Sequence, residues 1–215
     1  MKWLAVGIGA ALLFSSTAKG NAQVEDADNM QKQQKTRTIR MWDACDPDSF
    51  NAAVGSGTCT AGHHGKTLFQ DFIGEMQSDR IAGAWRFNPL LDASQGDFKL
   101  VRLELKPGDQ TIIQNQGGET HTLTRVNKYG GGFIPVLNAL SGNLVPAPEC
   151  AKTLPDGSLV PQPESDANQF VEAGKTEAGP TAGSAALPQG VSQWQCCIHP
   201  WMRLTIVVKG HENEH

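Results

Sequence analysis

A chain of 215 residues is long enough for one good-sized domain and at most a small second one. Its hydrophobic fraction of 39% and charged fraction of 19% are ordinary for a globular protein, which argues against a polytopic membrane protein and against disorder throughout. The formal net charge of -4 argues against nucleic-acid binding, which needs a basic face. The 23 Gly and 12 Pro favour many turns and few long helices.

The N-terminus has the pattern of an export signal. Lys2 gives a positive start, Trp3–Phe14 is an apolar run, and Gly20–Ala22 offers small residues for cleavage. The apolar run is shorter than the roughly 20 residues that span a bilayer. We therefore predict a signal peptide over residues 1–22 and a periplasmic or secreted mature protein without a membrane span.

We predict a flexible lead-in over residues 23–44, a single domain over 45–210 and a tail over 211–215. One helix is expected early in the domain, over Leu68–Ser78. Thr67 and Gln70 have the spacing of a capping box, and apolar residues follow at helical intervals.

Alternating apolar residues and turn-forming residues predict that the rest of the domain is built mainly of strands. The expected strands are Ala84–Phe87, Leu100–Leu105, Thr111–Asn115, His121–Val126, Ser192–Cys196 and Leu204–Lys209. Pro107-Gly108-Asp109 is expected to form a turn between two of them. A Pro- and Gly-rich segment, about 141–190, shows little periodicity and predicts a long irregular insertion.

The cysteines form an odd set, which needs explanation in an exported protein. One should be a metal ligand or a reactive thiol, and the other four can form two disulfides in three ways. Proximity favours a Cys45–Cys59 bridge. The five cysteines are Cys45, Cys59, Cys150, Cys196 and Cys197.

The segment that carries chemistry lies between the last two expected strands. It reads Cys196-Cys197-Ile198-His199-Pro200-Trp201-Met202. Thiolate, imidazole and thioether ligands close together favour copper, and two His, one Cys and a weak axial Met are typical of an electron-transfer copper site. The missing second His is best supplied by His121, at the start of an upstream strand.

Cys196 is the expected ligand because a Cys-x-His spacing from Cys197 would be too cramped for one trigonal plane. Side chains alternate along a strand, so Cys197 should face away from the metal and be free to pair with Cys150.

These two segments resemble the cupredoxins, the type 1 blue copper proteins. An upstream strand carries a single His, and a Cys–His–Met loop with amicyanin-like spacing precedes the last strand. The resemblance implies an all-β, Greek-key β-sandwich that holds one copper ion by His121, Cys196, His199 and Met202. The family often has Asn after the upstream His; here it is Thr122, whose hydroxyl can make the equivalent hydrogen bond to the Cys loop.

The resemblance also implies a one-electron carrier and not an enzyme. We expect the His199 ring to reach the surface through an apolar patch of Ile198, Pro200 and Trp201. A redox protein partner would dock there, and the protein is expected to be a monomer. Only one Cys–His cluster is visible and paired His-x-His motifs are absent, which argues against an oxidase.

Other interpretations remain open at this point. A copper-delivery or copper-homeostasis protein could use the same ligands without fast redox chemistry, and a structural β-domain would make the ligands coincidental. His211–His215 matches the zinc-protease pattern H-E-x-x-H, but it follows a strand and is expected to be a frayed tail. His63 and His64 are expected to be a solvated pair.

Overall fold

A computed structural model describes residues 34–60, 66–92, 101–162, 168–181 and 187–210. The fold below is that of the compact unit Lys35–His215. The predicted signal peptide, the His63–His64 pair and the tail with His211 and His215 lie outside the described residues.

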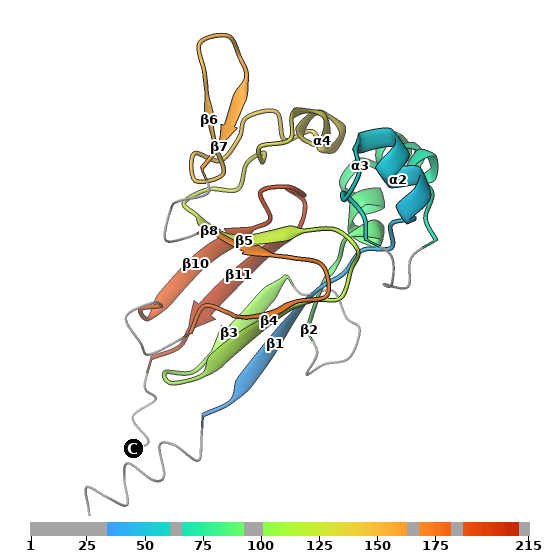
Figure 1. Cartoon of the computed structure of the whole chain (residues 1–215). Helices are drawn as coiled ribbons and strands as arrows, with labels where there is room; N and C mark the ends of the chain where they lie inside the picture. Colours follow the sequence, from blue (N-terminus) through green and yellow to red (C-terminus); the bar gives the residue numbers. More distant parts are fainter. Residues whose placement is uncertain (1–33, 61–65, 93–100, 163–167, 182–186, 211–215) are drawn as a thin grey trace, which may run out of the picture. The chain divides into compact units, whose positions relative to one another are not determined.

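The strands of the described chain form two mixed sheets and a separate hairpin (Figure 1). The four-stranded sheet has the order β2-β1-β4-β9, formed by Leu90–Asp92, Thr36–Met41, Gln110–Asn115 and Thr176–Ala178. The five-stranded sheet has the order β3-β11-β10-β5-β8, formed by Arg102–Leu105, Arg203–Val208, Gly190–Gln195, His121–Val126 and Asn168–Val171. A separate hairpin pairs β6 (Ala151–Thr153) with β7 (Leu159–Pro161).

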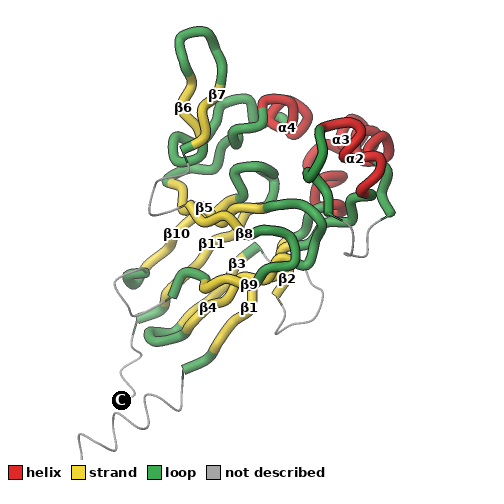
Figure 2. The backbone as a smooth tube through the Cα atoms, viewed as in Figure 1, coloured by secondary structure: helices red, strands yellow, loops and turns green. Residues whose placement is uncertain are grey.

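The two larger sheets share one hydrophobic core, and Figure 2 shows their strands as two layers. Strand β11 alternates buried and partly buried residues along its length, as does β4 apart from its exposed first residue. A strand that buries every second residue places one face on the core and the other toward solvent. The core residues include Ile39 and Met41 of β1, Ile113 of β4, Leu123 of β5, and Leu204, Ile206 and Val208 of β11.

Several predicted strands are confirmed with small shifts in their ends. Strand β5 has the predicted bounds, and β3, β4, β10 and β11 lie where alternation placed them. The expected turn before β4 is also present. Gly108 has φ 91°, and the Lys106 N–H donates to Asp109 Oδ2 at 2.9 Å.

Three predictions about local structure are wrong. The predicted helix continues through Ala84–Phe87, so α3 runs over Phe69–Phe87 and no strand forms there. A single glycine, Gly83, costs a helix only about 1 kcal/mol, and alanines on both sides favour helix. The described chain has two further helices, α2 (Pro47–Val54) and α4 (Pro135–Ser141), so one N-terminal helix was too few.

The third error concerns the segments expected to lack regular structure. Residues 36–41 of the expected lead-in form β1, which pairs parallel with β4 from Thr36↔Gln110 to Met41↔Asn115. The expected irregular insertion contains the β6–β7 hairpin, β8 and β9. Strands β6 to β9 have only three or four residues each, too few to show a period. Strands β1, β8 and β9 pair with strands that are distant in the sequence, and this pairing stabilises them more than their own pattern does.

No helix in the described ranges combines the length and apolarity needed to cross a membrane.

Helix α2 begins at a local signal, since the Asp46 side chain accepts from the Ser49 N–H at 2.9 Å. Helix α3 packs against both α2 and α4. The helices thus lie beside the same end of the sheets as the loop between β10 and β11 (Figure 1).

Candidate metal centre

Two pieces of the five-stranded sheet supply the predicted ligands. His121 is the first residue of β5, and Cys196, His199 and Met202 lie on the loop that joins β10 to β11. Two main-chain hydrogen bonds close this loop: the Cys196 N–H donates to the Met202 carbonyl and the Met202 N–H to the His199 carbonyl, each at 2.9 Å. Because β10 pairs with both β5 and β11, the loop is held beside His121.

His121, Cys196 and His199 form a compact donor cluster, in which one ligand atom of each lies within 4.8 Å of the others. The two Nδ1 atoms are 3.1 Å apart, and Cys196 Sγ lies 4.0 Å from His121 Nδ1 and 3.8 Å from His199 Nδ1. All three side chains are buried. The structure therefore brings three of the four predicted ligands together.

The spacing fits a small transition-metal ion. Ligand bonds of roughly 2.0 Å to nitrogen and 2.3 Å to sulfur would separate three ligands in one plane by roughly 3.5 to 3.8 Å. The observed separations lie close to these values. The Nδ1–Nδ1 distance of 3.1 Å also suits a hydrogen bond in the metal-free protein. Sulfur and imidazole donors together are those preferred by copper and zinc.

The protein environment favours the thiolate form of Cys196, which is the form that binds metal. The N–H groups of Thr122 and His199 point at its Sγ, at 3.2 and 3.4 Å. Burial alone raises the pKa of the Cys196 thiol, but hydrogen bonds and charge from His121 and His199 hold it well below its usual value.

The Thr122 hydroxyl makes the hydrogen bond to the cysteine loop that an Asn often makes in the cupredoxins. Its Oγ1 accepts from the Cys197 N–H at 2.7 Å, and its own N–H donates to Cys196 Sγ. One residue therefore positions both neighbouring cysteines.

Both favoured disulfides are present, and Cys196 is the free cysteine. Cys150 pairs with Cys197, and Cys45 pairs with Cys59. Cys196 packs in the main core, whereas Cys197 lies in a second cluster with Cys150 and Val126. The two adjacent side chains thus face different parts of the protein, as the strand alternation predicted.

A buried carboxylate holds the outer nitrogen of His121. Asp43 follows β1, is 0% exposed, and places Oδ2 3.1 Å from His121 Nε2. The N–H groups of Gly118 and Glu119 donate to the same carboxylate at 2.8 and 3.1 Å. Only glycine fits at position 117, because a Cβ there would overlap the Asp43 carboxylate.

A second carboxylate lies beside the outer nitrogen of His199. Glu119 Oε2 is 3.5 Å from His199 Nε2, and Asn88 Nδ2 donates to the same oxygen at 3.1 Å. Asn115 supports the loop that carries Glu119, since its Nδ2 donates to the Glu119 carbonyl at 2.7 Å. Sequence reasoning missed Asp43, Asn88 and Glu119, because no local pattern marks them as neighbours of a histidine.

These contacts favour the charged form of each group, so they raise the pKa of the two histidines and lower that of Asp43. Burial alone lowers the pKa of His199, but the charge of Glu119 and the hydrogen bond to Cys196 outweigh it and raise the value to about 10. Burial likewise lowers and Asp43 raises the pKa of His121, with a net increase. Burial raises the pKa of Asp43, but His121 and the two loop N–H groups bring it below its usual value.

The expected exposure of His199 is wrong. The residue is 3% exposed, Trp201 is 0% exposed and Pro200 is buried. The His199 and Trp201 ring centres are 5.4 Å apart, and Trp201 lies 6.2 Å from Phe72 of α3. Helix α3 was predicted at the sequence level, but its position over this loop was not.

Met202 is 0% exposed and packs in the main core. Its main chain closes the ligand loop, which places the side chain on the same short segment as Cys196 and His199. Its role as an axial ligand stays a prediction.

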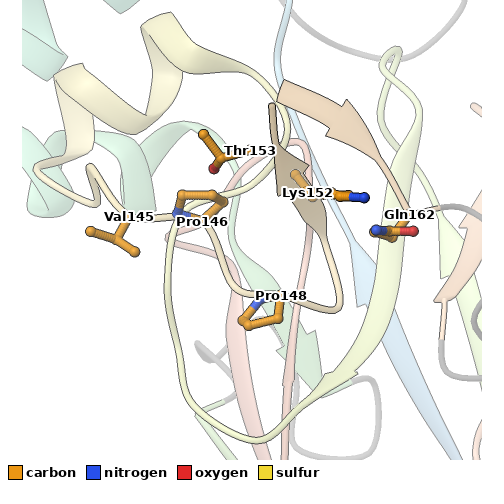
Figure 3. A pocket seen from close by; sticks show the side chains of 7 residues that line it. Val145, Pro146, Pro148, Lys152, Thr153 and Gln162 are labelled. Atoms are coloured by element: carbon orange, nitrogen blue, oxygen red, sulfur yellow. The ribbon is translucent and has the colours of Figure 1, made fainter. Parts of the chain in front are cut away.

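A separate shallow pocket lies near the β6–β7 hairpin (Figure 3). Its lining residues are Val145, Pro146, Pro148, Ala151, Lys152, Thr153 and Gln162. None of these is a His, Cys, Asp or Glu, so the pocket offers no competing metal site.

Comparison with protein-family models and with curated protein sequences finds no match. Among solved structures, the neighbours are cupredoxins at low identity. A purple cupredoxin from Nitrosopumilus maritimus is 13% identical, with a TM-score of 0.30, over 55% of this chain and 88% of that one. A Cu(I) amicyanin with a methionine-to-alanine substitution is 14% identical, with a TM-score of 0.29, over 52% of this chain and 72% of that one. The buried His-Cys-His cluster resembles a type 1 copper site.

Proposed function

We propose that this chain is a type 1 copper-binding protein that carries single electrons, with a cupredoxin-type Greek-key sandwich. The observation that supports this most directly is the buried cluster of His121, Cys196 and His199, with both Nδ1 atoms facing the Cys196 sulfur. Copper bound there would supply a one-electron Cu(II)/Cu(I) couple. The residues would hold it in one fixed geometry, so that little rearrangement accompanies each electron.

Copper is favoured over zinc by affinity and by the ligand set. Nitrogen and sulfur sites generally bind Cu²⁺ more tightly than Zn²⁺. A site with two imidazoles, one thiolate and a nearby thioether is also typical of electron-transfer copper. In the proposed site Met202 is the weak axial ligand.

The buried position of the ligands favours a carrier over a delivery protein. Delivery requires a partner's ligands to reach the metal and displace those of the donor protein. Here His121 is 0%, Cys196 1% and His199 3% exposed. The Cys150–Cys197 bridge further fixes the loop, so the site is built to retain its ion.

We propose that a redox protein docks near His199, Pro200 and Trp201. Because these residues are buried, the partner would contact the structure that covers them. The electron would then cross Trp201, next to His199 on one side and Phe72 on the other. We assign no enzymatic activity and propose a monomer.

The proposed location is the periplasm or the cell exterior. The export pattern over residues 1–22 suggests it, and the two disulfides are compatible with an oxidising compartment. Detection of the mature N-terminus near residue 23 in exported protein would test this location.

The visible spectrum of the Cu(II)-loaded protein tests the function. We expect an intense thiolate-to-copper charge-transfer band that Cys196→Ser abolishes. The matched control is the double variant Cys150→Ala/Cys197→Ala, which removes the neighbouring sulfurs and should keep the band. Tight binding of zinc together with a colourless copper form would contradict the proposal.

A second measurement tests the axial ligand. Met202→Leu should keep the copper and the band but raise the reduction potential, because it removes a weak donor and leaves the site drier. Loss of all copper binding from a folded variant would instead show that Met202 is an essential ligand.

Kinetics separate the carrier from the delivery protein. A carrier should resist removal of Cu(I) by a moderate chelator and should exchange electrons quickly with a partner or a small redox dye. Ready loss of Cu(I) with slow electron exchange would favour delivery.

A further inference from the structure

The outer nitrogens of both histidines meet carboxylates, although the two carboxylates come from different loops. Asp43 follows β1 and Glu119 precedes β5. Asp43 Oδ2 lies 3.1 Å from His121 Nε2, and Glu119 Oε2 lies 3.5 Å from His199 Nε2. Neither residue is more than 6% exposed.

We propose that Asp43 and Glu119 are positioning residues that orient the two histidines and lower the reduction potential of the bound copper. This inference rests on the proposed function, because it concerns the same site.

The orienting role follows from hydrogen-bond chemistry. A neutral imidazole carries one proton, on either Nδ1 or Nε2. A carboxylate accepts only, so Asp43 requires the proton of His121 on Nε2 and leaves Nδ1 free to bind metal. The Glu119 carboxylate, 3.5 Å from His199 Nε2, likewise favours the proton of His199 on Nε2. Both rings are thereby fixed with Nδ1 toward Cys196.

The two carboxylates are themselves held in place. Asp43 accepts the N–H groups of Gly118 and Glu119, and Glu119 accepts from Asn88 Nδ2. Neither side chain can turn away without leaving buried donors unpaired, which costs free energy. The negative charges therefore stay beside the histidines in both redox states.

The effect on potential follows from charge. With neutral histidines, the thiolate and two carboxylates surround the metal with more negative charge than Cu(II) or Cu(I) neutralises. Buried charges interact strongly because the surroundings are of low dielectric. Cu(II) compensates one more negative charge than Cu(I), so the carboxylates favour the oxidised state.

The test compares Glu119→Gln and Asp43→Asn with Glu177→Gln, an exposed carboxylate on β9 of the other sheet. Each site variant should raise the ratio of Cu(I) to Cu(II) affinity about tenfold, a potential increase of about 59 mV for one electron. Asp43→Asn should have the larger effect because its contact is shorter. Glu177→Gln should leave the potential near the wild-type value.

Nuclear magnetic resonance of the diamagnetic Cu(I) protein gives an independent readout. The wild type should show slowly exchanging, low-field Nε2–H protons from His121 and His199. Glu119→Gln should shift the His199 proton upfield and leave that of His121 nearly unchanged.

The outcomes distinguish this inference from the proposed function. A wild-type protein without the thiolate-to-copper band would overturn both. A wild-type protein with the band, combined with unchanged potentials and Nε2–H resonances in the variants, would overturn the carboxylate roles alone. If Asp43→Asn does not fold, Glu119→Gln decides by itself, because Glu119 accepts fewer main-chain hydrogen bonds.

Discussion

The β10–β11 hairpin and the region from β1 to α3 contribute to one site in different ways. The hairpin segment 190–208 carries Cys196, His199 and Met202, whose atoms would contact the ion. The segment 36–87 carries Asp43 and Phe72, which touch only the ligands or the residues that cover them. In the proposed site the first region supplies three of the four ligands, and the second sets the charge and the solvent access beside them.

We therefore expect the two regions to affect different properties, namely copper binding and the properties of the bound copper. Removing Cys196 or His199 from the hairpin should remove the metal or its band, whereas changes in the N-terminal region should leave the metal bound with altered properties. Variants in the two regions test this separation.

Removing a histidine should have the largest effect. His199→Ala should abolish the charge-transfer band. It should weaken copper binding by more than the roughly 10–100-fold that is typical when a residue hydrogen-bonded to a metal ligand is replaced. Phe72→Leu in α3 is the matched change in the other region and should keep the band. Copper stoichiometry and the visible spectrum measure both. A band that survives in His199→Ala would show that His199 is not a ligand.

The two disulfides allow a comparison of stability. Their sequence separations are 47 for Cys150–Cys197 and 14 for Cys45–Cys59. By the chain-entropy relation, removing them should lower the free energy of unfolding by about 4 and about 3 kcal/mol, respectively. Urea unfolding of the two double-alanine variants measures this. The reverse order would show that native contacts, and not loop length, set their contributions.

Replacing Thr122 should have a smaller effect on both properties. Thr122→Val keeps the shape but leaves the buried Cys197 N–H without its acceptor, which should cost about 1–3 kcal/mol. The band should persist with a small shift, since the loop is still closed at Met202. Thr176→Val, on the exposed strand β9, is the control and should be nearly neutral. Equal effects of the two changes would argue that the Thr122 hydroxyl does not hold the loop.

Trp201→Phe should change stability least. Among the described residues, the buried Trp201 Nε1 has no hydrogen-bond partner, so the replacement loses packing but also removes an unpaired N–H. These effects oppose each other and should leave a net change within about 1 kcal/mol. The copper band should be retained while electron transfer to a partner slows. A loss of several kcal/mol would indicate that an unseen water or other group satisfies Nε1.

Local spacing in the sequence was enough to predict that Cys196 and His199 lie close together. Cys196, His199 and Met202 are within seven positions, and short-range spacing on a loop between two strands leaves few arrangements. Strand alternation also separated Cys196 from Cys197 correctly. The upstream His121 was found because it begins a strand with a clear alternating pattern.

The surroundings of these residues could not be predicted from local patterns, because they depend on how distant segments pair and pack. Asp43 and His121 are 78 residues apart in the sequence. They meet because β1 pairs parallel with β4. No local pattern in residues 36–41 predicts this pairing. The burial of His199 depends on where α3 packs, and a helix carries no sequence signal for the loop that it covers. The donors on the β10–β11 loop follow from short-range spacing, whereas the approach of His121 and the charge and exposure of the site follow from long-range pairing and packing.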